Sequence, residues 1–179
     1  MFNQKLRINR YILIFLLLIT IILTVLYLVG IRVNTSSSYP PGFYLVSEAN
    51  QYQENDLVLF CPPPGHAMTL AMERRYIDPG HCPSGTTPVM KRIIALAGDQ
   101  IEFTPTITVN GKALPDSIRL SVDSMDRPLP QLASFTVPEQ AFFAYSEHAP
   151  RNSFDSRYYG AVPLHNIIGH IRPLLLFPQ

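Results

Sequence analysis

The chain has 179 residues, which is enough for one domain and an appendage, and its formal net charge is +1. A charge this close to balance excludes the broad basic surface that nucleic-acid binding requires, so nucleic acid is not an expected partner. Apolar residues are concentrated near the N-terminus, where residues 11–30 contain no charged side chain. A helix of this length spans the roughly 30 Å hydrocarbon core of a bilayer.

This apolar run favours a retained membrane anchor over a cleaved secretory signal. A cleaved signal has an apolar core of about 7–15 residues and ends in a small-x-small cleavage site, which "VGIRVN" lacks. Lys5, Arg7 and Arg10 precede the run, while only Arg32 closely follows it. The positive-inside rule therefore places the N-terminus in the cytoplasm. The expected order is a cytoplasmic segment (1–10), a transmembrane anchor (11–31) in the inner membrane, and an extracytoplasmic domain (32–179).

The chain contains two cysteines, Cys61 and Cys82, and both fall in the expected exported domain. In an oxidising compartment such a pair predicts a disulfide, with two free thiols as the alternative. Two cysteines without C-x-x-C spacing make a poor ligand set for zinc. We therefore expect no metal at this pair.

The exported domain has the pattern of short strands. Seventeen prolines in the chain argue against long helices in it, and only residues 68–75 suggest a short helical turn. "ITVNGKAL" predicts a hairpin around Asn110-Gly111. Residues 115–132 resemble a surface excursion, and "NIIGHIRPLLLF" a closing strand pair broken at Gly169 and Pro173. Further strand-like runs are "GFYLVS", "DLVLF", "VMKRIIAL", "SFTVP" and "AFFAYS". The fold class expected is mainly β, antiparallel, with coiled or barrel-like sheets.

One of these runs, "VMKRIIAL", carries Lys91 among apolar residues. Strand alternation would place Lys91, Ile93 and Ala95 on one face. A lysine on a buried face has a lowered pKa, and its neutral amine can act as a general base. The alternative is a surface lysine on an edge strand.

Directly after the apolar run, "NTSSSYPPGFY" offers a candidate nucleophile. A serine hydroxyl needs a base to become nucleophilic, and a lysine can fill that role. The prolines stiffen the segment and Gly42 permits a sharp departure from it. The alternative is an unstructured juxtamembrane linker. Near the other end of the domain, "RNSFDSRYYG" adds Ser153, which could hydrogen-bond a neutral lysine, and a carboxylate between arginines that is typical of an ion pair.

Three segments, "KRIIALAGD", "VNGK" and "NSFDSRYYGAVP", resemble the successive signature boxes of type I signal peptidases, in the same order after an N-terminal anchor. "NTSSSYPPGFY" departs from the Ser-Met-x-Pro box of those enzymes. It is similar to the Asn-x-Ser/Thr-x-Ser-x-Pro-x-Gly-x-Tyr pattern of TraF-type conjugative transfer peptidases, as is the segment between Cys61 and Cys82. Ala95 and Ala97 depart from the glycine and proline common near the Gly-Asp turn.

The resemblance implies a β-rich catalytic domain whose apolar surface rests on the lipid bilayer, and a role for each matching residue. By this match Ser38 is the nucleophile, Lys91 the general base, Ser36 an oxyanion donor, Ser153 the residue that orients the lysine, and Asp155 with Arg157 a structural pair behind the site. Because Ser36 and Ser37 adjoin Ser38, the choice of nucleophile among the three serines stays open.

The expected function is that of a serine endopeptidase that needs no cofactor. Its substrates would be exported precursor proteins or pilins with small residues before the cut. A housekeeping signal peptidase, a non-catalytic membrane-tethered module of a transfer or secretion channel, and a self-cleaving repressor are the alternatives. The anchor and the absence of a DNA-binding segment argue against the repressor. Whether the acyl-enzyme ends in hydrolysis or in joining to an amine stays open.

Overall fold

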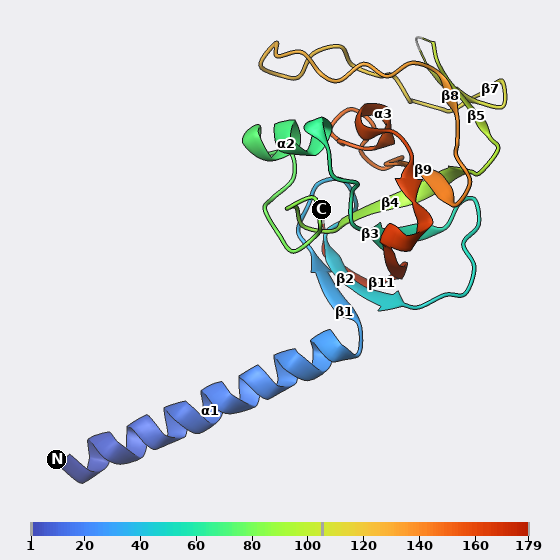
Figure 1. Cartoon of the computed structure of the whole chain (residues 1–179). Helices are drawn as coiled ribbons and strands as arrows, with labels where there is room; N and C mark the ends of the chain where they lie inside the picture. Colours follow the sequence, from blue (N-terminus) through green and yellow to red (C-terminus); the bar gives the residue numbers. More distant parts are fainter. Residues whose placement is uncertain (1, 105, 179) are drawn as a thin grey trace.

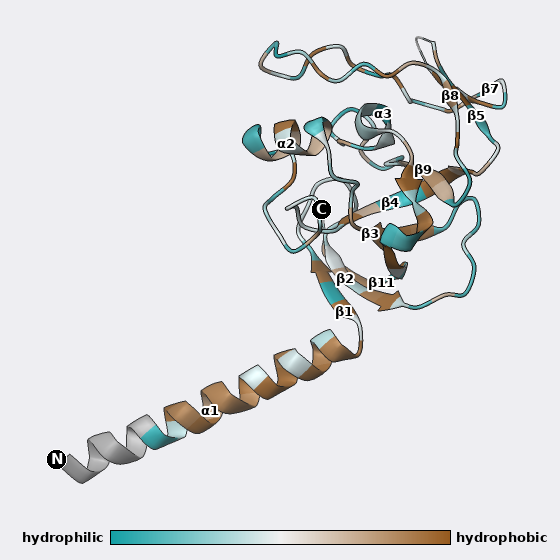
Figure 2. Ribbon diagram, in the orientation of Figure 1, coloured by the Kyte–Doolittle hydropathy of each residue, from teal (hydrophilic) through white to brown (hydrophobic). Residues whose placement is uncertain are grey.

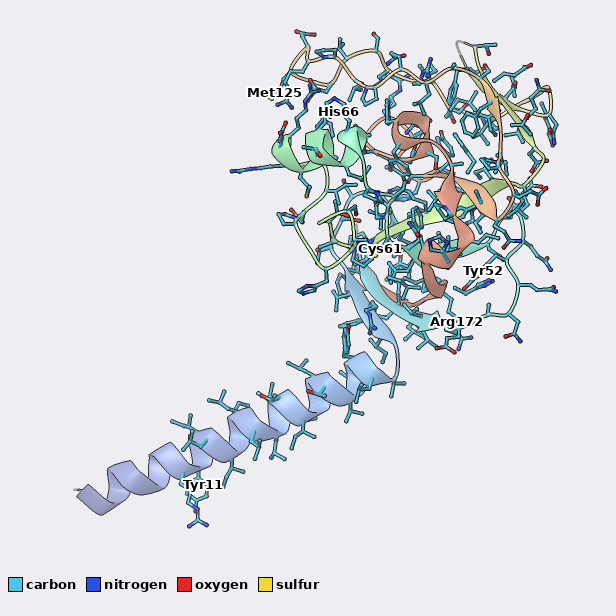
Figure 3. All side chains as sticks on the ribbon, in the orientation of Figure 1. Tyr11, Tyr52, Cys61, His66, Met125 and Arg172 are labelled. Atoms are coloured by element: carbon cyan, nitrogen blue, oxygen red, sulfur yellow. A yellow bond between two sulfur atoms is a disulfide. The ribbon has the colours of Figure 1, made fainter. Side chains whose placement is uncertain are left out.

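A long N-terminal helix, α1 (Phe2–Leu28), leads into a β-rich body (Figure 1). The computed structural model describes residues 2–104 and 106–178, and the side chains from Arg10 onward. Within these residues one stretch, Arg10–Leu28, is long and apolar enough to cross a membrane, with a mean hydropathy of 2.9. Figure 2 shows this apolar surface along the helix, and Figure 3 shows Tyr11 projecting from it, away from the body. The helix ends at Leu28, three residues before the predicted end of the anchor at residue 31.

The body contains two antiparallel sheets. The larger sheet has seven strands in the order β1-β2-β11-β3-β4-β9-β10 and is curled (Figure 1). Its strands are β1 (Ile31–Asn34), β2 (Gly42–Ser47), β3 (Leu57–Phe60), β4 (Val89–Leu96), β9 (Ala141–Tyr145), β10 (Val162–Pro163) and β11 (Ile167–Leu176). The smaller sheet has the order β7-β6-β5-β8, with β5 (Gln100–Phe103), β6 (Ile107–Val109), β7 (Lys112–Ala113) and β8 (Phe135–Thr136). The predicted fold class is confirmed, and so is the hairpin at Asn110-Gly111, which joins β6 to β7.

Three short helical elements complete the body: α2 (His66–Glu73), α3 (Ser156–Tyr159) and the 3-10 turn η1 (Leu164–Asn166). The helix α2 begins two residues earlier than the predicted turn and ends two residues earlier. Residues 115–132 form a long arm beyond the smaller sheet, as predicted, with Met125 exposed on it.

The prediction of a strand pair at the C-terminus was wrong. β11 is a single ten-residue strand that pairs with β3 at its start and with β2 over the rest of its length. Its register shifts near Gly169 and Pro173, so these residues bend the strand instead of ending it. A side chain at Gly169 would come within 2.6 Å of the Ser47 carbonyl oxygen, which explains why glycine stands there.

The strand β4 crosses the centre of the larger sheet and carries Lys91. Its register against β9 shifts between Ile93 and Ala95. Ile93 packs with Val58 and Phe142, whereas Ala95 packs with Ile94 in a separate core cluster. The predicted common face of Lys91, Ile93 and Ala95 is therefore wrong at Ala95, because the irregularity breaks the alternation.

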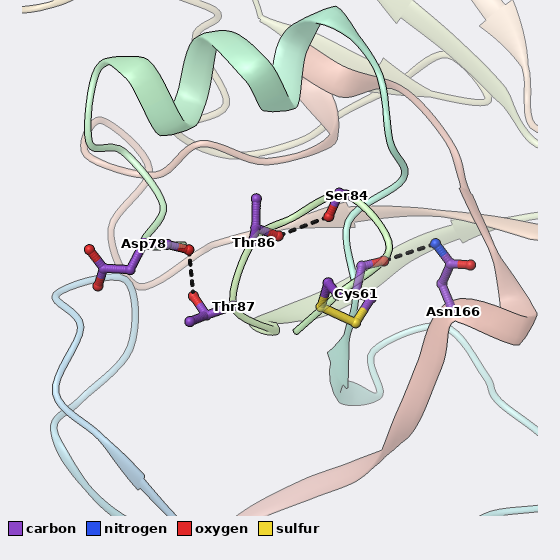
Figure 4. Close-up of a disulfide and its surroundings, with 7 residues drawn as sticks. Cys61, Asp78, Ser84, Thr86, Thr87 and Asn166 are labelled. Atoms are coloured by element: carbon purple, nitrogen blue, oxygen red, sulfur yellow. Dashed lines mark hydrogen bonds between the residues drawn. A yellow bond between two sulfur atoms is a disulfide. The ribbon is translucent and has the colours of Figure 1, made fainter. Parts of the chain in front are cut away.

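The predicted disulfide is present between Cys61 and Cys82, with sulfurs 2.02 Å apart (Figure 4). It connects the end of β3 to the loop that precedes β4 and encloses α2. Asn166 also fixes the backbone at Cys61, because its side-chain amide donates to the Cys61 carbonyl oxygen at 2.9 Å. Thr87 donates to the Asp78 carbonyl from both its N–H and its hydroxyl, so hydrogen bonds close the segment that contains Cys82 and leads to β4.

Replacing both Cys61 and Cys82 with serine should lower the free energy of unfolding by about 3 kcal/mol, since the open loop gains entropy when unfolded. Chemical denaturation of the full chain in detergent micelles measures this difference. Ser84→Ala, which removes only one hydrogen bond to Thr86 just outside the closed loop, serves as the control. Equal unfolding midpoints for the double variant and the parent protein would contradict the prediction.

Candidate active site

A groove of about 350 Å³ opens between the loop that follows β1 and the front of β4. Three further segments complete its walls: residues 76–78 after α2, residues 87–90 leading into β4, and residues 152–154 before α3. The groove brings together most of the predicted site residues, which come from three distant parts of the sequence. They are Ser36, Ser37, Ser38, Lys91 and Ser153.

The loop of residues 35–41 carries the three serines and is called the serine loop below. Asn34, the last residue of β1, holds it in shape. The side-chain amide of Asn34 donates to the carbonyl oxygens of Tyr39 at 2.9 Å and Pro40 at 3.1 Å. Its Oδ1 accepts from the backbone N–H of Ser36 at 3.1 Å and from the Ser36 hydroxyl at 2.7 Å. One side chain therefore closes the loop across the three serines. Asn34 is not among the predicted site residues, although it is the first residue of the TraF-type pattern.

Ser38 differs from the other two serines of this loop, Ser36 and Ser37, in the contacts around it. Its Oγ lies 3.1 Å from Ser36 Oγ. Because the Ser36 hydroxyl donates its proton to Asn34 Oδ1, Ser38 must be the donor in the contact between the two serines. The next residue, Tyr39, is buried and stacks on the ring of His148. Ser38 thus stands between a fixed hydroxyl on one side and a buried aromatic anchor on the other.

The backbone of Ser38 is also fixed, by Ser146 at the end of β9. The Ser146 hydroxyl donates to the Ser38 carbonyl oxygen at 2.6 Å. The Ser146 N–H in turn donates to Asp155 Oδ2 at 3.3 Å, and Ser146 is completely buried. This role could not be predicted from the sequence, since Ser146 lies 108 residues from Ser38 and belongs to no recognised motif.

Lys91 is 3% exposed and lies in the middle of β4, opposite Val58 of β3. Burial lowers the pKa of its amine to about 8; Asp155 acts in the opposite direction and Arg157 adds to the lowering. Within the described residues, no carboxylate lies within 4.0 Å of this amine. At pH 7 roughly one such amine in ten is neutral, against roughly one in 2,500 for a free lysine.

Asp155 and Arg157 lie behind the groove and are fully buried. Arg157 makes two parallel contacts with the Asp155 carboxylate, from Nε at 2.7 Å and from Nη2 at 2.9 Å. It also donates to the carbonyl oxygens of Ser153 at 3.0 Å and Ile118 at 2.9 Å. Asp155 caps α3 by accepting from the Arg157 backbone N–H. The pair therefore fixes the backbone around Ser153.

Ser153 itself is 6% exposed, and its hydroxyl has no hydrogen-bond partner among the described residues. It lines the groove that contains Lys91. A contact between the two side chains, as the resemblance implies, stays a prediction. The disulfide residues lie outside the lining of the groove. Among the described residues, no group of three or more His, Cys, Asp and Glu side chains could hold a metal ion.

Folding stability should depend on pH through Lys91. The unfolded chain keeps this lysine protonated up to about pH 10, whereas the folded protein releases the proton near pH 8. Between these values the unfolded state binds more protons, so the free energy of unfolding rises with pH. Relative to Lys91→Met, the parent protein should gain about 2 kcal/mol between pH 8 and pH 10. Denaturation curves of both proteins across this range measure the gain. A difference that does not change with pH would contradict the lowered pKa.

Comparisons of the sequence with known proteins point to one family. The family model described as "Signal peptidase, peptidase S26" matches residues 6–175. A plasmid transfer protein TraF of Escherichia coli is 40% identical over 152 residues, which cover 83% of this chain and 85% of that protein. A conjugal transfer protein TraF of Agrobacterium fabrum is 34% identical, covering 83% of this chain and 84% of that protein.

Among solved structures, a signal peptidase I of Enterococcus faecalis matches with a TM-score of 0.40 and 23% identity, covering 69% of this chain and 98% of that one. The family match extends over nearly the whole chain, from within α1 to within β11. The chain belongs to the signal peptidase family, peptidase S26.

Proposed function

We propose that this protein is a membrane-anchored serine endopeptidase that cuts exported precursor proteins with Ser38 as nucleophile and Lys91 as general base. The observation that carries the proposal is the groove, which is lined both by a serine fixed on its hydroxyl and its carbonyl side and by a buried lysine. The family supports the same reaction class.

The proposed reaction is acyl transfer. Neutral Lys91 takes the hydroxyl proton of Ser38 while Ser38 Oγ attacks the scissile carbonyl carbon. The Ser38 N–H and the Ser36 hydroxyl then hold the oxyanion, and loss of one such donor typically reduces the rate about 10²–10³-fold. The protonated Lys91 gives its proton to the leaving amine. Water or a second amine finally releases the acyl group from Ser38.

The hydrogen bonds at rest indicate what must move for this reaction. The Ser38 hydroxyl now donates to Ser36, and the Ser36 hydroxyl donates to Asn34. For attack, the Ser38 hydroxyl must turn towards Lys91 and the Ser36 hydroxyl towards the oxyanion. Both are rotations about one side-chain bond, so the loop backbone that Asn34 holds can stay in place.

The groove also suits an extended substrate. β1 is an edge strand of the larger sheet, so its outer backbone groups are free to pair with a substrate segment. Deeper walls are apolar, formed by Leu59, Met90 and Ile171. Such walls favour small apolar side chains before the cut, as in the Ala-x-Ala-like sites of exported precursors.

The membrane would lie against the same end of the domain as the groove. α1 would be the single-pass anchor in the inner membrane, with residues 1–10 in the cytoplasm, the span at 11–31 and the catalytic domain at 32–179 on the periplasmic side. The serine loop begins at the end of β1, only a few residues beyond the helix. Apolar side chains near this end are exposed and suit contact with lipid: Phe43, Leu174, Leu175, Leu176 and Phe177.

The relatives suggest the substrates. Both compared relatives are named as transfer proteins of plasmids or conjugation. We infer that the natural substrate is an exported protein of a conjugative transfer apparatus, with a pilin precursor as the first candidate.

Ser38→Ala and Lys91→Met should each reduce precursor cleavage at least about 10³-fold, because each removes one member of the proposed dyad. Ser37→Ala is the matched control and should keep activity within about threefold, since the Ser37 hydroxyl lacks the contacts that fix Ser38. Mass spectrometry of pilin precursors co-expressed with each variant measures cleavage. Loss of activity in Ser37→Ala, with activity kept in Ser38→Ala, would move the nucleophile to Ser37.

The pH dependence of kcat/KM should show an acid limb with a midpoint of about 8, because Lys91 acts only when neutral. Below this value the rate should fall about tenfold for each pH unit, and above it the rate should level off. Initial rates with a peptide substrate between pH 5.5 and 9.5 test the profile. His148→Gln should leave the midpoint unchanged; a midpoint that shifts with His148 would identify a different base.

A further inference from the structure

A second cavity of about 370 Å³ adjoins the groove. The two share Ser37, Tyr76 and residues 152–154 in their linings, so they lie side by side. The second cavity extends past the end of α2 to the arm of residues 115–132, and it includes neither Ser38 nor Lys91. The proposed dyad does not account for this part of the surface.

Two arginines, Arg75 and Arg151, line the second cavity and are exposed. In the described part of the chain, no carboxylate lies within 4.0 Å of either guanidinium. The acidic residue in the lining, Asp123, already has partners. Arg127 contacts it at 2.7 Å and Arg74 at 3.7 Å, and the Tyr76 hydroxyl also donates to it. The cavity is therefore positively charged, with two cations free to bind an anionic group.

The backbone does not explain why an arginine stands at position 75. Arg75 follows the last turn of α2 with a φ of 59°, in the left-handed region. Its N–H bonds to the Met72 carbonyl, and the Tyr76 N–H bonds to the Ala71 carbonyl. This is the Schellman ending of a helix, a position where glycine is usual because other residues are strained there. The side chain is thus present despite a conformational cost.

The residues that line the first cavity indicate which part of a bound substrate would reach the second cavity. The free edge of β1, the apolar walls and Lys91 all belong to the first cavity, which suits the part of the substrate before the cut. An extended chain whose scissile carbonyl lies at Ser38 leaves the groove past Ser37 and Ser153, the residues common to both cavities. On this path the residues after the cut would lie in the second cavity.

We propose that the second cavity binds a carboxylate on the leaving segment of the substrate, within the first few residues after the cut. This inference rests on the proposed function. The carboxylate belongs either to an aspartate or glutamate side chain or to the C-terminus of a short leaving segment. Arginine suits this group because its planar guanidinium can give a carboxylate two parallel hydrogen bonds. Such binding would add a sequence preference for residues after the cut, which the first cavity does not contact.

Three peptides with the same residues before the cut separate the two sources of carboxylate. The first has glutamate in the leaving segment and an amidated C-terminus; the second has glutamine and a free C-terminus; the third has glutamine and an amidated C-terminus. The full-length protein in detergent micelles should cleave one or both of the first two with kcat/KM roughly tenfold above the third. The preference should weaken between about 50 mM and 500 mM salt, since both arginines are exposed.

Variants at the two arginines test the assignment. Arg75→Gly removes the charge and places the favoured residue at the helix end, so stability should hold or rise while part of the preference is lost. Combined with Arg151→Gln, it should bring the three peptides to equal kcat/KM. A double change to glutamate should instead favour a peptide with lysine in the leaving segment. The control is Arg172→Gln, on β11 outside both cavities, which should keep the full preference (Figure 3).

Binding separates failure of this inference from failure of the proposed reaction. Leaving-segment peptides that carry a neutral fluorophore are titrated against the Ser38→Ala protein, and fluorescence anisotropy reports the affinity. Tighter binding of the carboxylate peptides, lost in the double arginine variant, supports the cavity even if no peptide is cleaved by the parent protein. Equal affinity for all three peptides, or equal kcat/KM in the parent protein, would overturn the proposal.

Discussion

The buried ion pair between Asp155 and Arg157 holds the site together. Arg157 binds the carbonyl oxygens of Ile118 and Ser153, while Asp155 caps α3 and accepts from the Ser146 N–H. Since Ser146 also holds the Ser38 carbonyl, one pair connects the arm, α3, the end of β9 and the serine loop. Removal of one member of a fully buried pair typically costs about 3–5 kcal/mol, because it leaves an unpaired charge in the interior. The positions of Ser38 and Ser153 therefore depend on both residues being present.

The same two residues also have opposite effects on the pKa of Lys91. Asp155 favours the charged amine and Arg157 disfavours it, so the two neighbours act against each other and burial decides the direction of the pKa. If the carboxylate were free of Arg157, its attraction would keep the lysine protonated and unable to act as a base. When the pH falls below this pKa, the buried amine becomes charged and the free energy of unfolding decreases. Such a loss of stability is common at functional sites.

Features carried by local residue patterns could be predicted from the sequence, and features set by distant contacts could not. Alternating apolar runs and the Asn110-Gly111 turn predicted strands and a hairpin, and an isolated pair of cysteines predicted the disulfide. The irregularity in β4 and the continuous β11 arise from pairing with neighbouring strands, which no single segment contains. Ser146 likewise acquires its partner only through the fold. The role of Asn34, by contrast, could have been predicted from the sequence, because an asparagine side chain often hydrogen-bonds the backbone of the loop that follows it.

The two adjoining cavities differ in whether Lys91 lines them, and this difference suits the chemistry of its amine. A substrate carboxylate placed beside this amine in the first cavity would raise its pKa and hold its proton. The second cavity lacks Lys91 but contains Arg75 and Arg151, so a carboxylate bound there would pair with these arginines instead of with the amine. An apolar segment in the first cavity would further exclude water from the lysine and keep it neutral. Under the proposed function, separate recognition of the apolar and the anionic parts of a substrate would allow binding strength to increase without protonating Lys91.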